Sequence, residues 1–422
     1  MLDMAVIREN PDRVRELCAR KNVDVDVAHI VGLDNQRRAL LQEVEALKAQ
    51  RNAGSKAIGN MKDAEERQAK IAEMGGLGDR IADLDNEIRV VESHLHDLML
   101  GVPNLPDDRV PVGPDAGSNT LYREGGSRSD RDFDAKPHWE LAERLGIIDF
   151  PRGVKVAGTR GYFLRGDGAR LQRALVAWML DVHTRKHGYT ELVVPHLVTG
   201  ESLVGTGNLP KFADDLYKDE AEDKWLIPTA EVPITNLYRD EILDAASLPI
   251  YHTAASQCFR NENISAGRDV RGIKRVFEFH KVELVKFAHP DNGEEELERL
   301  LGESLAIVEA LGIPHRVLIL STGDMSFSSA ITYDIETWAP GSGEWLEISS
   351  CSLFRDFQAR RANLRFRPEG GGRPQFLHTL NGSALALPRT IIAILEHYQQ
   401  ADGTVVIPEV IRPYMGGQEV IG

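Results

Sequence analysis

Apolar residues recur at helical spacing through most of the first hundred positions. Leu33, Leu40, Val44 and Leu47 follow a heptad-like spacing. The pattern resumes, in alternating steps of three and four residues, at Ile81, Leu84, Ile88, Val91, Leu95 and Leu98. We therefore predict an antiparallel coiled-coil hairpin of two long helices, joined by a turn near residues 54–61.

Charge and glycine content divide the predicted hairpin. Residues 31–70 carry eight Lys or Arg against six acids, whereas residues 71–100 carry two against seven. A solvated structural hairpin and an arm that lays its more basic helix along RNA both fit this pattern. Gly75, Gly76 and Gly78 predict a bend or local break near the start of the second helix.

After the helices, Pro, Gly and Asp dominate residues 101–119, which predicts a linker. We expect a helical arm over residues 1–102, a connecting segment over 103–135 and a second domain over 136–422. In that domain we expect an amphipathic helix over 171–186 and a strand over 188–195 that ends at Pro195. Several later strands are separated by turns. The chain is therefore predicted to be α+β, with a mostly antiparallel sheet flanked by helices.

Composition narrows the classes of function. The chain has 422 residues, 42% of them hydrophobic, and a formal net charge of −15, which disfavours non-specific coating of nucleic acid but allows a local basic surface. Cys18, Cys258 and Cys351 are far apart and lack metal-ligand spacing. With a charged N-terminus and no apolar run of membrane length, we expect a cytoplasmic protein.

Residues 258–284 alternate like two strands but carry charges where a plain sheet would be apolar. Arg260 and Glu262 share a parity, as do Arg275, Phe277, Phe279, Lys281 and Glu283. Arginine binds phosphate, an aromatic ring stacks on a base and a carboxylate accepts from an amine. A nucleotide-binding hairpin, with loop 263–273 closing over its ligand, and an exposed hairpin with surface ion pairs are equally compatible with the residues alone.

Two further stretches favour the nucleotide. In the strand predicted at 344–352, Glu347, Ser349 and Cys351 share one parity and Ile348 and Ser350 the other; an acid beside hydroxyls suits an oxygen-liganded Mg²⁺. Residues 380–396 predict a strand and turn that enter an apolar helix. Arg389 in its first turn opposes the helix dipole and so requires an anion, either a nucleotide phosphate or a local carboxylate.

Taken in order, these motifs resemble the bacterial-type seryl-tRNA synthetases, which are class II aminoacyl-tRNA synthetases. The resemblance spans the chain and rests on residues 205–212 (GTGNLPKF), 229–232 (TAEV), 259–262 (FRNE), 281–283 (KVE), 347–352 (EISSCS), 356–361 (DFQARR), 381–383 (NGS) and Arg389. It implies serine activation by ATP to seryl-adenylate, followed by transfer to the 3′ end of tRNA-Ser, and also to tRNA-Sec if the chain recognises it. It further implies Mg²⁺, a homodimer with Pro195 at its interface, and a coiled coil that binds the long variable arm of the tRNA.

The resemblance also assigns residues. Arg260, Arg275 and Arg389 would be catalytic, by positioning and neutralising phosphate. ATP would be bound by Arg260, Asn261, Glu262, Arg275, Val276, Phe279, Glu347, Ile348, Ser349, Ser350 and Arg389. Serine would be bound by Thr229, Ala230, Glu231, Arg260, Glu283, Asn381 and Ser383. Glu347 and Ser350 would hold the metal.

Phe277 and Glu278 depart from the family, which commonly has His-Gln there. From parity we expect Phe277 beside the nucleotide and Glu278 against the core. Two other functions fit parts of the sequence: a synthetase-like paralogue that loads an amino acid onto a carrier protein, and a non-catalytic RNA-binding relative. The helical arm argues against the first, and the presence of Arg260, Glu283, Glu347 and Arg389 argues against the second.

Overall fold

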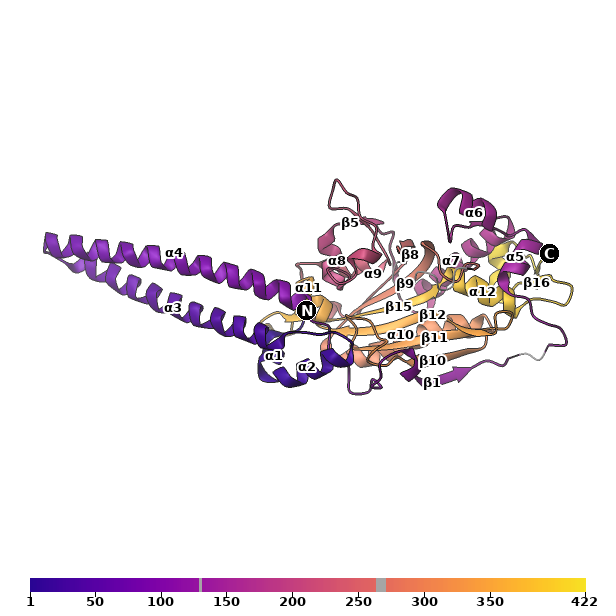
Figure 1. The fold of residues 1–422 in the computed structure, drawn as a ribbon, viewed down its shortest axis with the longest axis horizontal. Coiled ribbons are helices and arrows are strands. Elements are labelled where there is room, and N and C mark those ends of the chain that lie inside the picture. Colours follow the sequence, from indigo (N-terminus) through magenta and orange to yellow (C-terminus); the bar gives the residue numbers. More distant parts are fainter. Residues whose placement is uncertain (129–130, 263–270) are drawn as a thin grey trace. The chain divides into compact units, whose positions relative to one another are not determined.

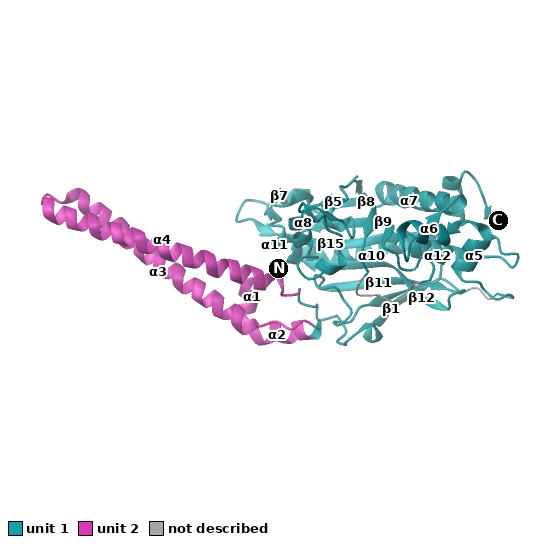
Figure 2. Cartoon of the chain, turned by 45° about the horizontal axis from the view of Figure 1, so that its top comes forward, with its two compact units in different colours: residues 1, 20–22, 104–422 teal, residues 2–19, 23–103 magenta. Residues whose placement is uncertain are grey.

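The computed structural model describes residues 1–128, 131–262 and 271–422 (Figure 1). The described chain divides into two compact units, one formed by residues 2–19 and 23–103 and the other by residues 1, 20–22 and 104–422 (Figure 2). The closing loop expected at 263–273 falls largely on residues outside this description. Among the described residues, no helix is both long and apolar enough to cross a membrane.

The smaller unit is helical, as the apolar spacing predicts. Its helices are α1 (Met4–Glu9), α2 (Pro11–Arg20), α3 (Val27–Asn60) and α4 (Ala64–Leu100). Helices α3 and α4 form the predicted antiparallel hairpin, with Val44, Ile81, Leu84 and Ile88 buried between them. Ion pairs flank this seam, among them Arg37 Nε to Glu92 Oε1 at 2.7 Å and Arg80 Nη2 to Glu43 Oε1 at 3.1 Å. The hairpin therefore has the apolar seam and charged borders of a coiled coil.

The glycines of the hairpin do not have the roles predicted for them. Helix α3 continues through Gly54, and the turn is only Met61–Asp63, where the Asp63 side chain accepts from the Glu66 N–H at 2.9 Å. A Cβ on Gly54 would lie 2.2 Å from Met74 Sδ, so this glycine allows close helix contact. Helix α4 is continuous through residues 75–78, so the predicted break is absent; a glycine inside a helix costs only about 1 kcal/mol relative to alanine.

The larger unit is built on an eight-stranded sheet. Its strands are, in spatial order, β1 (Thr120–Gly125), β10 (His315–Ile319), β11 (Ile331–Ala339), β12 (Glu344–Arg355), β15 (His378–Ala386), β9 (Glu278–Ala288), β8 (Ile250–Phe259) and β4 (Thr190–Glu191). Neighbours pair antiparallel except β4 and β8, which are parallel. The predicted mostly antiparallel α+β fold is confirmed.

One face of this sheet is covered by α10 (Gly293–Ala310), as contacts from β12 and β15 show. The Cys351 thiol donates to Ser304 Oγ, and a Cβ on Gly382 would lie 3.0 Å from Leu300. Helix α12 (Leu387–His397) follows β15 directly and buries Ile391 and Ile392 in the same apolar core. These contacts leave the side chains of opposite parity on the central strands to face a cavity.

The helix expected at 171–186 is confirmed as α7 (Asp167–Lys186). The strand expected at 188–195 is shorter than predicted. Pairing with β8 is limited to Thr190 and Glu191, and after Leu192 the chain leaves the sheet edge, so that Val193 is 98% exposed. The strand is shorter than expected because its pairing with β8 at the edge of the sheet lasts for only two residues.

Candidate active site

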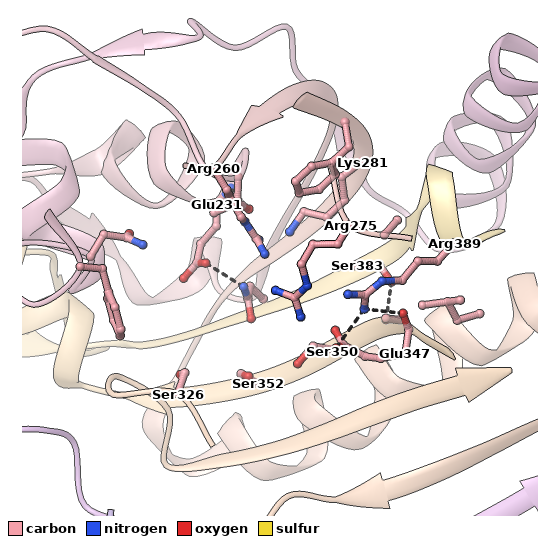
Figure 3. Close-up of a pocket in the computed structure, with 18 of the residues that line it drawn as sticks. Glu231, Arg260, Arg275, Lys281, Ser326, Glu347, Ser350, Ser352, Ser383 and Arg389 are labelled. Atoms are coloured by element: carbon pink, nitrogen blue, oxygen red, sulfur yellow. Dashed lines mark hydrogen bonds and ion pairs between the residues drawn. The ribbon is translucent and has the colours of Figure 1, made fainter. Parts of the chain in front are cut away.

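A cavity of about 380 Å³ opens on the central strands, where Figure 3 shows its polar side chains converging. Strands β9, β12 and β15, the start of α12 and the segments beside 260–262 and 274–276 all contribute to it. Fourteen of the residues assigned from the sequence line it: Thr229, Glu231, Arg260, Glu262, Arg275, Val276, Phe279, Glu347, Ile348, Ser349, Ser350, Asn381, Ser383 and Arg389. Residues up to 160 positions apart in the chain are therefore brought to one site.

At one end of the cavity, Glu231 accepts two side-chain amide hydrogen bonds. Gln358 Nε2 donates to its Oε1 at 2.7 Å, and Asn381 Nδ2 donates to its Oε2 at 2.8 Å. Burial, and then the nearby Glu283 carboxylate, raise the pKa of Glu231 to about 7. A cation placed beside Glu231 would lower that pKa again, so this end of the cavity is suited to an ammonium group.

Glu283 lies behind the cavity wall instead of lining it. Its side chain is fully buried; its Oε2 accepts from Thr229 Oγ1 at 2.7 Å and pairs with Lys281. Its Oε1 has no hydrogen-bond partner among the described residues. Glu283 thus orients Thr229 and Lys281, both of which line the cavity, and adds negative charge beneath it.

The two residues expected to share a strand face, Arg260 and Glu262, lie just beyond the end of β8. Glu262 has a left-handed backbone with φ 55°, which breaks the alternation. Both side chains nevertheless line the cavity, because the Arg260 N–H donates to the Phe277 carbonyl at 2.9 Å and Arg275 Nη1 donates to Glu262 Oε2 at 2.8 Å. The prediction that Arg260 and Glu262 share one face of a strand is therefore wrong, although both side chains reach the same cavity.

Arg389 is the third residue of α12 and contacts a carboxylate. Its Nη1 donates to the Glu347 carbonyl at 2.8 Å and lies 3.1 Å from Glu347 Oε2, while its Nε donates to the Lys274 carbonyl at 3.3 Å (Figure 3). Of the two counter-anions predicted for Arg389, the structure therefore shows the local carboxylate, which is Glu347. Glu347 is exposed in the cavity, so the same guanidinium remains within reach of a bound anion.

A β-bulge in β12 corrects the predicted faces of the strand. The register with β11 shifts so that Ile335 is opposite Ser349 and Glu336 opposite Glu347, which leaves Ile348 as the extra residue. Glu347 and Ser350, predicted on opposite faces, consequently both line the cavity. A bulge depends on hydrogen-bond register, which the sequence pattern does not reveal.

The surroundings of Glu347 and Ser350 suit a hard cation. Asp334, opposite Ser350 on β11, has an Oδ1 without a hydrogen-bond partner among the described residues. Burial, and then the Glu347 carboxylate, raise the pKa of Asp334 well above its usual range. Within the described chain no three His, Cys, Asp or Glu side chains form a complete metal site, so phosphate oxygens would have to complete the shell.

Three assigned residues do not line the cavity. Glu283 lies beneath it, Ala230 is buried in the apolar core, and Asn261 turns outward, where its side chain donates to the Asp214 carbonyl at 3.4 Å. Twelve further residues line it: Thr206, Gly207, Asn208, Phe212, Lys274, Lys281, Ser326, Ser328, Ser352, Phe354, Ala386 and Pro388. Most of these belong to or adjoin the motifs already quoted, but nothing in the sequence pattern pointed to Ser326 or Ser328.

The positions expected for Phe277 and Glu278 are wrong. Both side chains line a second cavity, of about 580 Å³, together with Tyr162, Gln172 and His280. Strand β9 begins only at Glu278, so the strand parity does not extend back to Phe277. Glu278 is exposed and does not meet the core.

Two known protein families match the chain. Residues 1–106 match the family described as the seryl-tRNA synthetase N-terminal domain, and residues 212–398 match the tRNA synthetase class II core domain (G, H, P, S and T). A serine–tRNA ligase of Thermomicrobium roseum is 61% identical over all of this chain and 95% of its own length. One from Herpetosiphon aurantiacus is 55% identical over the full length of both.

Two solved structures of seryl-tRNA synthetases are similar to this chain along its full length. Seryl-tRNA synthetase of Pyrococcus horikoshii, complexed with ATP, superposes with a TM-score of 0.94 at 35% identity over 100% of this chain and 99% of its own. Cytoplasmic serine–tRNA ligase of Naegleria fowleri, in complex with AMP, gives 0.89 at 32% identity, covering 100% and 98%. The likeness includes both the helical hairpin and the sheet.

Proposed function

The chain belongs to the seryl-tRNA synthetase family and is an ATP-dependent serine–tRNA ligase, and we propose that its 380 Å³ cavity is where serine and ATP react. One observation carries this proposal: Arg260, Arg275 and Arg389 line the same cavity as Glu231 (Figure 3). Three guanidinium groups match a triphosphate, and a carboxylate matches the ammonium of an amino acid.

In the first step, an oxygen of the serine carboxylate forms a bond to the α-phosphorus of ATP, and the bond from that phosphorus to the bridging oxygen breaks. Pyrophosphate leaves with the bonding electrons, and seryl-adenylate remains. No protein nucleophile is needed. Arg260 would hold the α-phosphate, and Arg275 and Arg389 the departing phosphates, so that rate acceleration comes from positioning and charge neutralisation.

In the second step, a hydroxyl of the terminal ribose of tRNA attacks the seryl carbonyl carbon. AMP leaves with the electrons of the mixed-anhydride bond, and the hydroxyl proton passes to a phosphate oxygen or to water. Glu262 would accept from the adenine amino group while Phe279 stacks on the ring. Both residues line the cavity, where Glu262 pairs with Arg275 and the Phe279 ring centroid lies 5.1 Å from the Arg260 guanidinium carbon.

For serine itself, Glu231 and Thr229 would bind the ammonium, with Asn381 and Ser383 closing the pocket. Glu283 would act from below by orienting Thr229, at 2.7 Å, and Lys281. Ala230 and Asn261 would serve through their backbone and packing. Because threonine differs from serine by one methyl, which is worth about 1–3 kcal/mol of discrimination, the fit around the side chain must be tight.

Mg²⁺ would be held by the Glu347 carboxylate and the Ser350 hydroxyl, with ATP phosphates as further ligands. When bound, it would neutralise negative charge on those phosphates. Glu347 would then exchange its contact with Arg389 for the cation, which releases the guanidinium toward phosphate. The orphaned Asp334 oxygen supports a positive charge nearby.

Members of this family bind tRNA, and we propose that the hairpin α3–α4 contacts the long variable arm of tRNA-Ser. Helix α3 carries five Lys or Arg against three acids, whereas α4 is acidic. We further propose that the protein forms a homodimer through the region of Pro195 and acts in the cytoplasm. We also propose that its domains divide at residues 102 and 135, and that it charges tRNA-Sec as an additional substrate.

Serine-dependent ATP–pyrophosphate exchange, followed by charging of total tRNA, tests the proposal. We expect exchange with serine and charging of tRNA-Ser. Exchange without charging would instead favour a protein that loads a carrier, and absence of exchange with any amino acid would favour a non-catalytic relative. The relatives, which match over the full chain with its arm, support the ligase.

A further inference from the structure

A buried histidine–carboxylate pair lies behind the proposed ATP end of the cavity. His138, the first residue of α5 (His138–Leu145), places Nδ1 3.0 Å from Oε1 of Glu396, which lies near the end of α12. Both side chains are nearly inaccessible, at 2% and 0% exposure. Neither lines the main cavity, so the chemistry proposed above leaves the pair without a role.

Glu396 is fully satisfied as an acceptor. Besides Nδ1, the backbone N–H of His138 donates to it at 2.9 Å, and Ser342 donates through its N–H at 2.8 Å and its hydroxyl at 2.7 Å. Burial alone would raise the pKa of Glu396, but the hydrogen bonds from His138 and Ser342 outweigh it and hold that pKa below its usual range. Glu396 is therefore ionised and can only accept.

The other ring nitrogen of His138 makes the informative contact. The backbone N–H of Ile273 donates to Nε2 at 3.2 Å. Since Nε2 accepts and Glu396 accepts, the proton must reside on Nδ1, and the ring is a neutral, fixed tautomer. Gly272 packs against the same nitrogen: its φ is +75°, and a Cβ there would lie 2.0 Å from Nε2.

The anchored segment carries the phosphate-binding groups. The next residue, Lys274, accepts from Arg389 Nε at 3.3 Å through its carbonyl and pairs with Glu344 at 2.6 Å through its ammonium. Arg275 follows directly and pairs with Glu262. Arg389 and Glu396 are seven residues apart on α12, about two turns, and so lie on one face of that helix.

We propose that His138 is a positioning residue for ATP binding. Through Glu396 it links residues 272–275 to α12, and it thereby fixes the position of Arg275 relative to Arg389. This inference rests on the proposed function, because it takes both arginines to be ATP ligands. A loose tie would misplace the two guanidinium groups, and displacements of about 1 Å can cost about a hundredfold in rate. The serine end, at Glu231, would be unaffected.

Two substitutions separate the two bonds of the ring. In His138→Asn the amide nitrogen replaces Nδ1 and keeps the bond to Glu396, while the acceptor for Ile273 is lost. In His138→Gln the amide oxygen reaches the position of Nε2 and keeps the acceptor. His315→Asn is the control, because His315 is also buried and hydrogen-bonded, with Nδ1 3.1 Å from the Ile313 carbonyl, but lies on the distant strand β10.

The experiment measures KM for ATP, KM for serine and kcat of exchange in the full chain, with the melting temperature. We expect kcat/KM for ATP to fall about tenfold or more in His138→Asn and by less than about threefold in His138→Gln, with KM for serine unchanged. His315→Asn should lower only the melting temperature. Gly272→Ala, which presses on Nε2 from outside, should reproduce the ATP effect if His138→Asn does not fold.

Unchanged kinetics in the Asn and Ala variants would overturn the inference, as would equal rises in KM for serine and ATP, or a greater loss in His138→Gln than in His138→Asn. These results differ from failure of the proposed function, in which the wild-type chain itself shows no serine-dependent exchange.

Discussion

The guanidinium carbon of Arg260 lies 5.1 Å from the centroid of the Phe279 ring. The cation thus rests near the ring on which we propose that adenine stacks, and both side chains line the same cavity. The contact with the ring restricts the arginine side chain, so that phosphate binding requires less side-chain ordering.

Arg260→Ala is therefore expected to lower kcat for serine-dependent exchange by about 10²–10³-fold, because a charge aimed at the reacting phosphate is lost. Arg260→Lys should recover only part of the rate, since an ammonium lacks the two-pronged contact with phosphate. The control is Arg123→Ala, an exposed residue of β1 that pairs with Glu309. Near-normal exchange in Arg260→Ala would refute the assignment.

The raised pKa of Glu231 predicts a pH dependence of serine binding. With that pKa at about 7, the carboxylate is mostly protonated at pH 6 and mostly ionised at pH 8. An ammonium needs the ionised form, so KM for serine should fall as pH rises through 7, by roughly tenfold per unit on the acidic side. Exchange rates over pH 5.5–8.5 at saturating ATP provide the measurement.

Glu231→Gln keeps the shape of the side chain and removes its titration, and so serves as the matched variant. Its KM for serine should be high and independent of pH in this range. If the wild-type KM for serine also stays flat between pH 6 and 8, Glu231 does not bind the ammonium.

The sequence predicts the helical hairpin correctly but not the position of its turn. Apolar spacing predicted the α3–α4 hairpin because its buried seam, with Val44 and Leu84, is made of local repeats. It misplaced the turn, because Gly54 serves close contact with Met74, a partner twenty residues away. Long-range contacts of this kind leave no local signal.

The site shows the same limit. The types and order of the residues were enough to predict that Arg260, Arg275 and Arg389 belong to one site. They were not enough to predict the side of the strand on which each residue lies. The bulge at Ile348 and the left-handed backbone of Glu262 both interrupt strand alternation, and each is set by pairing with a neighbouring segment. Phe277 was misassigned for the same reason, since it precedes the first residue of β9.

Glu347→Gln is expected to raise the Mg²⁺ concentration needed for half-maximal exchange by at least about tenfold, because even indirect partners of a metal ligand contribute about 10–100-fold to affinity. The amide also loses its ion pair with Arg389, so KM for ATP should be compared at saturating Mg²⁺. Glu309→Gln, on the exposed face of α10, is the control. An unchanged Mg²⁺ titration in Glu347→Gln would exclude this carboxylate as a ligand.

The basic surface of the hairpin is the proposed tRNA contact. Arg38 and Lys56 on α3, and Lys62 in the turn, have exposed side chains with no ion pair among the described residues. Reversing all three to Glu should lower kcat/KM for tRNA charging and leave serine-dependent exchange unchanged, because the cavity belongs to the other unit.

The salt dependence of charging should also weaken, by about one unit of log–log slope for each lost phosphate contact. Reversing Lys155, Lys186 and Lys224, three exposed cations of the other unit, changes the net charge by the same amount and is the control. Equal losses in both variants would assign the effect to bulk charge, and a parallel loss of exchange would assign it to misfolding.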